Sequence, residues 1–420
     1  MQGEPTAALA QWLQHRPVSE ELLLVEFNFQ PWWLEDGPST PLTAIYLAAA
    51  GQLACTVTDA ILESGAEPPA QQYRRWLEQH KLFSVVPGQP IPLLPTYIPK
   101  PWGQEIWFTG IEERGVCRFG RSEASVPVPW LQVILPGARG GKPGEPLVLL
   151  KVLDPSAEEV TGDLYFELHE EKREVYVVTH VDPSAWPDGT GYIRYGFSAP
   201  KLQEVGSEGE FREAYRAAVA GYEVVRREID ALPEGQAVPP GLLAQEVSLR
   251  REMESFTHLR PLRVGDVVVV PLRMPHSLQH GVRTIEFQTP VYERKILSFA
   301  QRVLTQGHWD TESAVSMMRL QPPGPETFDC LQDAGGVTVE RIVDFEDFEV
   351  RRVKIEGGAQ YELPDLPTYA LIMMVEGRVR LEGLVYRPEE AFLLPAGAGP
   401  LLLSPQAPQP LVLLLALPRS

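Results

Sequence analysis

Cysteine is scarce in this sequence, and its three copies lie far apart. Cys55, Cys117 and Cys330 are odd in number and include no Cys-x-x-Cys pair. Widely separated cysteines are typical of proteins from a reducing compartment, whereas a secreted disulfide framework needs an even set. We therefore expect buried thiols without a catalytic role.

Long apolar runs and a targeting segment are also missing. No stretch approaches the length of a membrane-spanning helix. The first residues, Met1–Thr6, lack the basic region and the apolar core of a signal peptide. These absences predict a cytoplasmic protein that does not associate with membranes.

Positive charge is in short supply as well. The chain has 37 Lys and Arg residues against 56 Asp and Glu residues, which gives a net charge of −19. Nucleic acids and anionic membranes bind to basic faces, so neither is expected as a partner. An acidic protein can still bind a phosphorylated small molecule, because such a ligand needs only a local cluster of Lys and Arg.

The residues that are present predict a folded, β-rich protein. Hydrophobic residues make up 44% of the chain and charged residues 22%, an ordinary balance for a soluble protein. The 41 prolines shorten helices and punctuate strands, which favours many turns. Because 420 residues exceed one ordinary hydrophobic core, two or three domains are expected.

Residues 1–95 are predicted to form a mixed α/β extension of unknown role. The apolar patterns indicate helices at residues 7–15, 43–64 and 71–82 and a strand at residues 21–29. His15 and His80 have no partner at ligand spacing, so we expect surface or capping histidines. The proline-rich residues 87–101 are expected to form an ordered linker to the next region.

From residue 96 to residue 320, short apolar runs recur between Gly, Pro and Asp turns, which is typical of an antiparallel barrel or sandwich. These runs lie at residues 128–135, 146–153, 164–168, 175–181, 192–195, 264–271 and 284–288. Two helices, at residues 208–232 and 241–258, are predicted between them. They form an insert in the β region, at about residues 205–260.

Residues 321–420 begin with a natural hinge, Pro322-Pro-Gly-Pro, and then repeat the rhythm of turns and strands. Strands are expected at residues 337–343, 348–356, 368–375, 377–381, 390–394 and 410–415. No histidine occurs after His308. This second β region is therefore expected to be structural, with no metal and no catalytic group.

The stretch Leu164–Tyr176 concentrates possible metal ligands. If it is extended, alternation places Glu167 and His169 on one face and the apolar residues between them on the other. A short hairpin turn at residues 170–173 would then bring Glu174 opposite that pair. Each of these residues alone is more often a solvated or hydrogen-bonded group than a ligand. Together they predict a metal site supplied by one hairpin.

A fourth candidate ligand, His276, lies far downstream. It follows an apolar run that begins after Gly265 and ends at Pro271. A Glu-x-His, a Glu five residues later and a distant Gly-x5-Pro-x4-His form the two-part spacing of a cupin barrel. Imidazole and carboxylate groups in such a set suit a divalent transition metal. The fold class that follows is mainly β, with two cupin (jelly-roll) barrels, a helical insert in the first barrel and the N-terminal α/β extension.

With these motifs, the chain resembles the type I phosphomannose isomerases, which are two-barrel cupin enzymes. The motifs that carry the likeness are Glu167-Leu-His169, Lys172-Arg-Glu174 and Pro275-His276. Further context comes from residues 149–154, Tyr195-Gly-Phe and residues 281–288. The family's glutamine ligand is replaced here by Glu167. The likeness covers roughly Pro99 to the carboxyl end and leaves residues 1–95 outside.

The resemblance implies a metal-dependent isomerase that interconverts mannose 6-phosphate and fructose 6-phosphate. Its metal ligands would be Glu167, His169, Glu174 and His276. The resemblance favours Zn²⁺, although two carboxylates and two imidazoles also suit Mn²⁺, Fe²⁺ or Ni²⁺. The implied partner is a small-molecule sugar phosphate, and the assembly is expected to be a monomer or homodimer.

Two further residues are implied to act on the substrate. Lys172 matches an active-site lysine of the family and would stabilise charge or relay a proton, although a lysine in a turn can also simply face solvent. Arg294 is the counterpart of the arginine in a family Thr-Tyr-Arg motif and would hold the phosphate or the enediolate. Other cations that could hold phosphate are Arg173, Arg273 and Lys295.

Two other functions stay open from the sequence. A sugar- or sugar-phosphate-binding module could keep the metal without isomerase activity. An iron-dependent oxygenase is a third possibility, because cupins host that chemistry and fold alone does not decide function. Four protein ligands argue against the oxygenase, since oxygen activation needs open coordination positions.

Overall fold

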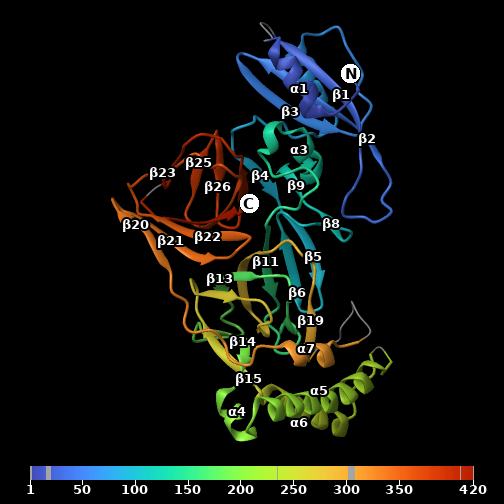
Figure 1. The fold of residues 1–420 in the computed structure, drawn as a ribbon, viewed down its shortest axis with the longest axis vertical. Coiled ribbons are helices and arrows are strands. Elements are labelled where there is room, and N and C mark those ends of the chain that lie inside the picture. Colours follow the sequence, from blue (N-terminus) through green and yellow to red (C-terminus); the bar gives the residue numbers. More distant parts are fainter. Residues whose placement is uncertain (1, 16–19, 234, 301–307, 407, 420) are drawn as a thin grey trace. The chain divides into compact units, whose positions relative to one another are not determined.

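The computed structural model describes residues 2–15, 20–233, 235–300, 308–406 and 408–419 (Figure 1). Within them the chain is mainly β, with 29 strands against seven α-helices. No described helix has the length and apolar character that a membrane span requires.

The chain forms two compact units. The first contains residues 1–96, 107–151 and 327–420, and the second contains residues 97–106 and 152–326. The three-part division expected from the sequence differs, because residues 1–96 and 327–420 belong here to one unit.

The first unit begins with a small α/β region. An antiparallel sheet has the order β1-β2-β3 and is accompanied by two helices. The elements are α1 (Pro5–Gln14), β1 (Glu21–Phe29), β2 (Thr40–Ala49), β3 (Gln52–Thr58) and α2 (Pro69–Gln79). Tyr73 and Trp76 of α2 pack against Ile45 and Leu47 of β2. The predicted helices near residues 7–15 and 71–82 and the strand at residues 21–29 are confirmed.

The helix predicted at residues 43–64 is wrong, because this segment forms the hairpin of β2 and β3. Strand β2 is the central strand of the sheet, so side chains on both of its faces are buried and the sequence lacks polar alternation. The turn joins Ala49 to Gln52 through Ala50 and Gly51, whose φ angles are 51° and 75°. A two-residue turn with positive φ at both positions matches the twist of an antiparallel hairpin.

A nine-stranded antiparallel sheet forms most of the rest of this unit. Its order is β10-β9-β4-β27-β24-β29-β22-β21-β20. The bounds are β4 (Ile91–Leu94), β9 (Arg118–Arg121), β10 (Ala124–Pro127), β20 (Asp329–Ala334), β21 (Val337–Asp344), β22 (Phe348–Ile355), β24 (Ala370–Glu376), β27 (Ala391–Leu394) and β29 (Leu411–Pro418). Three two-stranded sheets accompany it: β7 (Ile111–Glu112) with β8 (Gly115–Val116), β23 (Tyr361–Leu363) with β28 (Leu401–Leu403), and β25 (Val379–Leu381) with β26 (Leu384–Tyr386).

The strands predicted in residues 321–420 are confirmed, and their inward side chains form one apolar core that includes Val353, Ile372, Phe392 and Leu413. The arrangement as two separate cupin barrels stays a prediction. Cys55 and Cys117 are buried as expected, but the expectation fails for Cys330, which is exposed on the edge strand β20.

Two further segments before residue 151 differ from their predictions. The expected linker at residues 87–101 contains β4, which pairs with β27, and also β5 (Thr96–Lys100). The run at residues 128–135 forms the helix α3 (Val128–Ile134), followed by a short 3-10 turn at Pro136–Ala138. Helix α3 has proline in its first turn, a position where the missing N–H of proline costs nothing.

Two sheets form most of the second unit. One has the order β16-β13-β18-β11-β6-β5 and the other the order β15-β14-β17-β12-β19. The bounds not yet given are β6 (Gly103–Trp107), β11 (Leu149–Pro155), β12 (Phe166–Leu168), β13 (Glu174–Val181), β14 (Gly191–Phe197), β15 (Thr257–Leu262), β16 (Val267–Val270), β17 (His276–Leu278), β18 (Val282–Gln288) and β19 (Lys295–Ser298). Tyr176 and Val178 from the first sheet and Ile193 and Leu278 from the second share one core, so the sheets pack face to face.

Helices cover the outer face of the five-stranded sheet. They are α4 (Ala199–Val205), α5 (Glu208–Asp230), α6 (Pro240–Ser255) and α7 (Thr311–Met317). Helix α5 begins with a capping box between Ser207 and Glu210. Its buried residues recur every three or four positions, and Phe211 and Tyr215 pack against Phe166 of β12. The predicted helical insert is confirmed.

The hairpin predicted at residues 164–176 is wrong, because β12 and β13 belong to different sheets. Strand β12 pairs with β17 and β19, whereas β13 pairs with β16 and β18. Residues 169–173 therefore cross from one sheet to the other. The candidate ligands converge from two facing sheets and not from one hairpin.

Candidate metal centre

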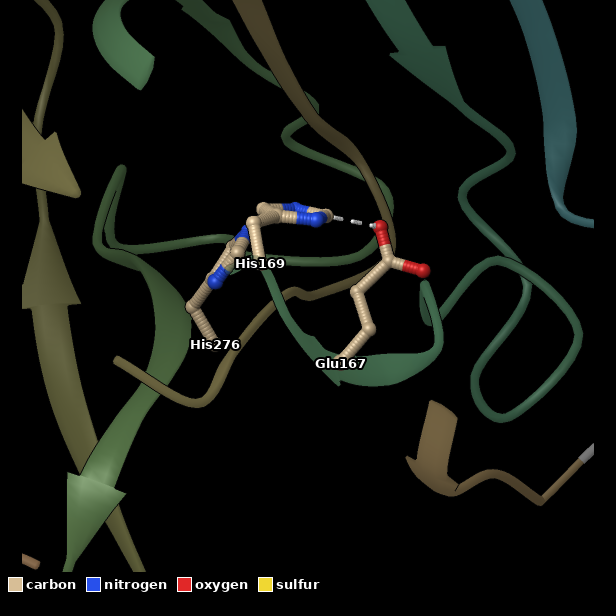
Figure 2. Close-up of side chains that lie close together, drawn as sticks. All are labelled: Glu167, His169 and His276. Carbon is tan, nitrogen blue, oxygen red and sulfur yellow. Dashed lines mark ion pairs between the residues drawn. The ribbon is translucent and has the colours of Figure 1, made fainter. Parts of the chain in front are cut away.

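The structure brings all six predicted site residues into one region of the second unit. They come from four chain segments: the β12 strand and its exit, the crossing to β13, the start of β17 and the loop before β19. The residues are Glu167, His169, Lys172, Glu174, His276 and Arg294. Figure 2 shows three of them, Glu167, His169 and His276, with their side chains directed toward one another.

Strand pairing explains why these three side chains meet. Glu167 of β12 lies directly opposite His276 of β17. Phe166 and Leu168 point to the helical side of the sheet, so Glu167 points to the opposite, inner face. One ligand atom each from Glu167, His169 and His276 lies within 4.8 Å of the other two. Such a spacing permits all three atoms to bind a single ion.

Glu174 lies beside the same two imidazoles. Its Oε2 is 3.0 Å from His276 Nε2, and its Oε1 is 3.4 Å from His169 Nε2. The side chain is only 2% exposed. It also accepts a hydrogen bond of 2.6 Å from the Tyr176 hydroxyl, which orients the carboxylate. Glu174 is thus a fourth candidate ligand, supplied by the facing sheet.

The hydrogen bonds of the two histidines fix which nitrogen faces the centre. His169 Nδ1 is 2.9 Å from the backbone oxygen of Glu293, and His276 Nδ1 is 2.9 Å from that of Met274. Because a carbonyl oxygen can only accept, each Nδ1 carries the proton and donates it. Each Nε2 therefore presents a lone pair to the centre, as in histidines that bind metal ions.

This geometry fits a divalent ion. His276 Nε2 lies 3.0 Å from an oxygen of Glu174, so one cation between the two atoms could bind both. His169 Nε2 and Glu167 Oε2 are buried and have no hydrogen-bond partner among the described residues. A metal ion would satisfy these buried atoms, which otherwise lack a hydrogen bond to offset their desolvation.

The electrostatics keep His169 and Glu174 in the forms that bind metal. Burial, together with the Lys172 ammonium, lowers the pKa of His169 well below its ordinary value. Burial alone would raise the pKa of Glu174, but the Lys172 ammonium outweighs it and holds this pKa well below the usual range. Neutral imidazole and ionised carboxylate are the states that ligate, so little proton release is needed on binding.

The two predicted catalytic residues flank this cluster. Lys172 is 7% exposed, and its Nζ lies 2.8 Å from Glu174 Oε1, so it is not a surface lysine. Arg294 is half-buried, with Nη1 3.8 Å from Glu167 Oε2 and its guanidinium 5.0 Å above the ring of Tyr165. Among the other cations considered, Lys295 forms an ion pair of 3.2 Å with Glu170.

The sequence did not single out three residues near the centre. Tyr176 and Glu286 are buried opposite each other on β13 and β18, and the alternation from Glu174 could have indicated Tyr176. Glu293 accepts hydrogen bonds from the backbone N–H groups of Glu170, at 2.8 Å, and Glu171, at 3.3 Å, through its Oε2. Since its backbone oxygen also holds His169, Glu293 ties the loop before β19 to the ligand segment.

Glu293→Ala is expected to weaken metal binding about 10-fold to 100-fold, the usual cost of losing a group that orients a ligand. The carboxylate clamps the turn after His169, so its loss lets the imidazole leave its position. The dissociation constant of Zn²⁺ would be measured by competition with a chromogenic chelator. Glu171→Ala, in the same turn but exposed, is the matched control and should bind like the wild type. Equal affinity of the two variants would contradict this role.

Solved structures of known proteins have a fold similar to that of this chain. The mannose 6-phosphate isomerase of Bacillus subtilis superposes with a TM-score of 0.57 over 78% of this chain and 99% of its own, at 15% sequence identity. A zinc-bound mannose 6-phosphate isomerase gives a TM-score of 0.55 at 13% identity, with the same coverage. The fold resembles that of the mannose 6-phosphate isomerases.

A variant of the phosphomannose isomerase from Salmonella typhimurium gives the same TM-score of 0.55, over 78% of this chain and 99% of its own, again at 13% identity. No model of a known protein family matches the sequence. No curated protein matches it by sequence either. The relation to these isomerases is therefore distant, and it concerns the fold.

Proposed function

We propose that this chain is a metal-dependent aldose–ketose isomerase that interconverts mannose 6-phosphate and fructose 6-phosphate. The observation that carries the proposal is the cluster of two imidazole Nε2 atoms and the Glu174 carboxylate beside the buried Lys172. The similarity in fold to solved mannose 6-phosphate isomerases supports it. Glu167, His169, Glu174 and His276 would hold the metal, with Zn²⁺ as the first choice and Mn²⁺, Fe²⁺ or Ni²⁺ as alternatives.

The reaction moves one proton from C2 of the aldose to C1 of the ketose and one between the two oxygens. A bound divalent ion would supply positive charge against the negative charge that develops on the sugar oxygens. Lys172 is suited to hold or move a proton, because its buried Nζ is positioned by Glu174 at 2.8 Å. Burial also excludes water, which strengthens this electrostatic contact.

Arg294 is proposed to bind the phosphate or the enediolate of the substrate. Its planar fork suits an oxyanion, and the ring of Tyr165 supports its position. Arg294→Ala should mainly raise KM if the side chain binds phosphate, or lower kcat if it contacts the enediolate. A loss of roughly 10-fold to 100-fold is expected for a hydrogen bond to a charged group. Steady-state kinetics with both parameters resolved would measure it, and unchanged kcat and KM would contradict either role.

The test of the function is an isomerase assay on the full-length, metal-replete protein. Mannose 6-phosphate would be supplied, and fructose 6-phosphate would be followed by a coupled enzyme reaction, with unphosphorylated mannose as the control substrate. Turnover of the phosphorylated sugar supports the proposal. Binding of a hexose phosphate without turnover would favour a sugar-phosphate-binding module instead. A metal-replete protein that neither isomerises nor binds any hexose phosphate would contradict both functions.

A further inference from the structure

The first unit contains a cavity that has no part in the proposed isomerase chemistry. Its volume is about 320 Å³, which lies in the usual range of small-molecule sites. The end of β3, the end of α2, the β9–β10 hairpin and α3 line it. All of its lining residues belong to the first unit, whereas the predicted metal ligands belong to the second.

Arg118 of β9 is the central charged group of this cavity. Its Nε donates a hydrogen bond of 2.7 Å to Ser125 Oγ, and its Nη2 donates one of 3.1 Å to the backbone oxygen of Ser125. These bonds fix the plane of the guanidinium. No carboxylate of the described residues forms an ion pair with it, and its Nη1 has no hydrogen-bond partner there. Burial lowers the pKa of Arg118.

The other charged groups of the cavity do not contact Arg118, so its guanidinium can bind a ligand. Lys81 and Glu123 form a short ion pair with each other, so they largely cancel. Asp59 raises the pKa of Arg118 through a longer-range attraction but does not contact it. His80, the residue that ends α2, also lines the cavity and can donate a hydrogen bond from its ring. Arg118 and His80 are thus positioned to bind an anion.

Apolar residues also line the cavity, among them Val57, Leu82 and Trp130. An indole face and aliphatic side chains beside a fixed guanidinium suit a ligand with two parts. One part is an oxyanion that takes the free Nη1 of Arg118, and the other is a flat or apolar group that contacts Trp130.

We propose that this cavity is a second ligand site, which binds a small organic phosphate or carboxylate carrying an aromatic or apolar group. Arg118 binds the oxyanion, Ser125 holds the guanidinium in place and Trp130 contacts the apolar group. The site would give the N-terminal region a binding role, because residues 57–60 and 80–82 line it. It does not depend on the isomerase activity of the second unit.

Isothermal titration calorimetry on the full-length, zinc-loaded protein tests this site with two probes, phenyl phosphate and benzoate. One molecule of at least one probe is expected to bind per chain, and the stronger of the two identifies the oxyanion. Arg118→Gln should weaken binding at least about tenfold, because it removes a charge-assisted hydrogen bond. Ala60→Phe adds an aromatic ring to the cavity lining and leaves Arg118 in place, so it should also weaken binding, provided that its melting temperature matches the wild type.

Two further variants separate this site from other cationic groups. Arg121→Gln is the matched control on the same strand, since the Arg121 guanidinium lies over the ring of Tyr386 and does not line the cavity. It should bind the probes like the wild type. Arg294→Gln reports any binding of the probes at the metal centre instead. The proposal is overturned if neither probe binds at millimolar concentration, if Arg118→Gln and Ala60→Phe bind normally, or if only Arg294→Gln loses binding.

Discussion

His169→Ala is expected to leave the protein without its metal ion. The imidazole supplies an Nε2 lone pair that is buried, has no hydrogen-bond partner among the described residues and lies near both Glu167 and Glu174. Without it, two carboxylates and one imidazole remain, so one of the four candidate donor groups is lost. A ligand that binds only the folded state at 100 times its dissociation constant stabilises it by about 2.7 kcal/mol, so this stabilisation should vanish.

The measurement is elemental analysis combined with thermal melts before and after chelation. Chelation should lower the melting temperature of the wild type but leave that of His169→Ala unchanged. His180→Ala is the matched control, because His180 lies on β13 but is exposed and outside the cluster. Full metal occupancy in the His169→Ala protein would refute the proposed ligand set.

The ligand cluster shows what alternation in a sequence can predict. A strand exposes every second side chain to the same face, so Glu167 could be assigned to the inner face from its apolar neighbours alone. His276 was recognised from the end of an apolar run, and it does begin a strand. The proximity of these side chains was thus predictable, whereas their ligation of a metal stays a prediction.

The path by which Glu174 reaches the cluster could not be read from the sequence. A turn of a few residues between two strands usually indicates a hairpin, but residues 169–173 cross between sheets. The choice depends on which distant strand pairs with β12, and that partner, β17, lies more than one hundred residues downstream. Long-range pairing is decided by packing of the whole core and leaves no local signal.

Glu293 was missed for a related reason. It acts through its backbone oxygen and through bonds to backbone N–H groups, so no ligand spacing marks it.

The errors in the predicted secondary structure have local causes. Strand β2 is buried on both faces, which removes the polar alternation of a strand, and α3 was mistaken for a strand because its apolar run is short. The proline in the first turn of α3 was the available signal.

Lys172→Ala is expected to lose most of the isomerase turnover while the metal stays bound. Lys172 is not a candidate ligand, and its Nζ lies 2.8 Å from Glu174 Oε1, at the edge of the cluster. If the ammonium both stabilises charge and moves a proton, its removal costs about 3–5 kcal/mol in the transition state, which is roughly 10²-fold to 10⁴-fold in kcat. Substrate affinity should change less than kcat, because the contact strengthens as charge develops.

Lys172→Arg separates the two roles of the ammonium, because arginine keeps the positive charge but does not release a proton. Recovery of turnover in Lys172→Arg would assign charge stabilisation, whereas turnover as low as in Lys172→Ala would assign proton transfer. Metal content must be measured in both variants, since Lys172 also helps to hold the pKa of Glu174 below its usual range. A metal-replete Lys172→Ala protein with wild-type kcat would exclude Lys172 from the reaction and leave Arg294 as the candidate group that contacts the substrate.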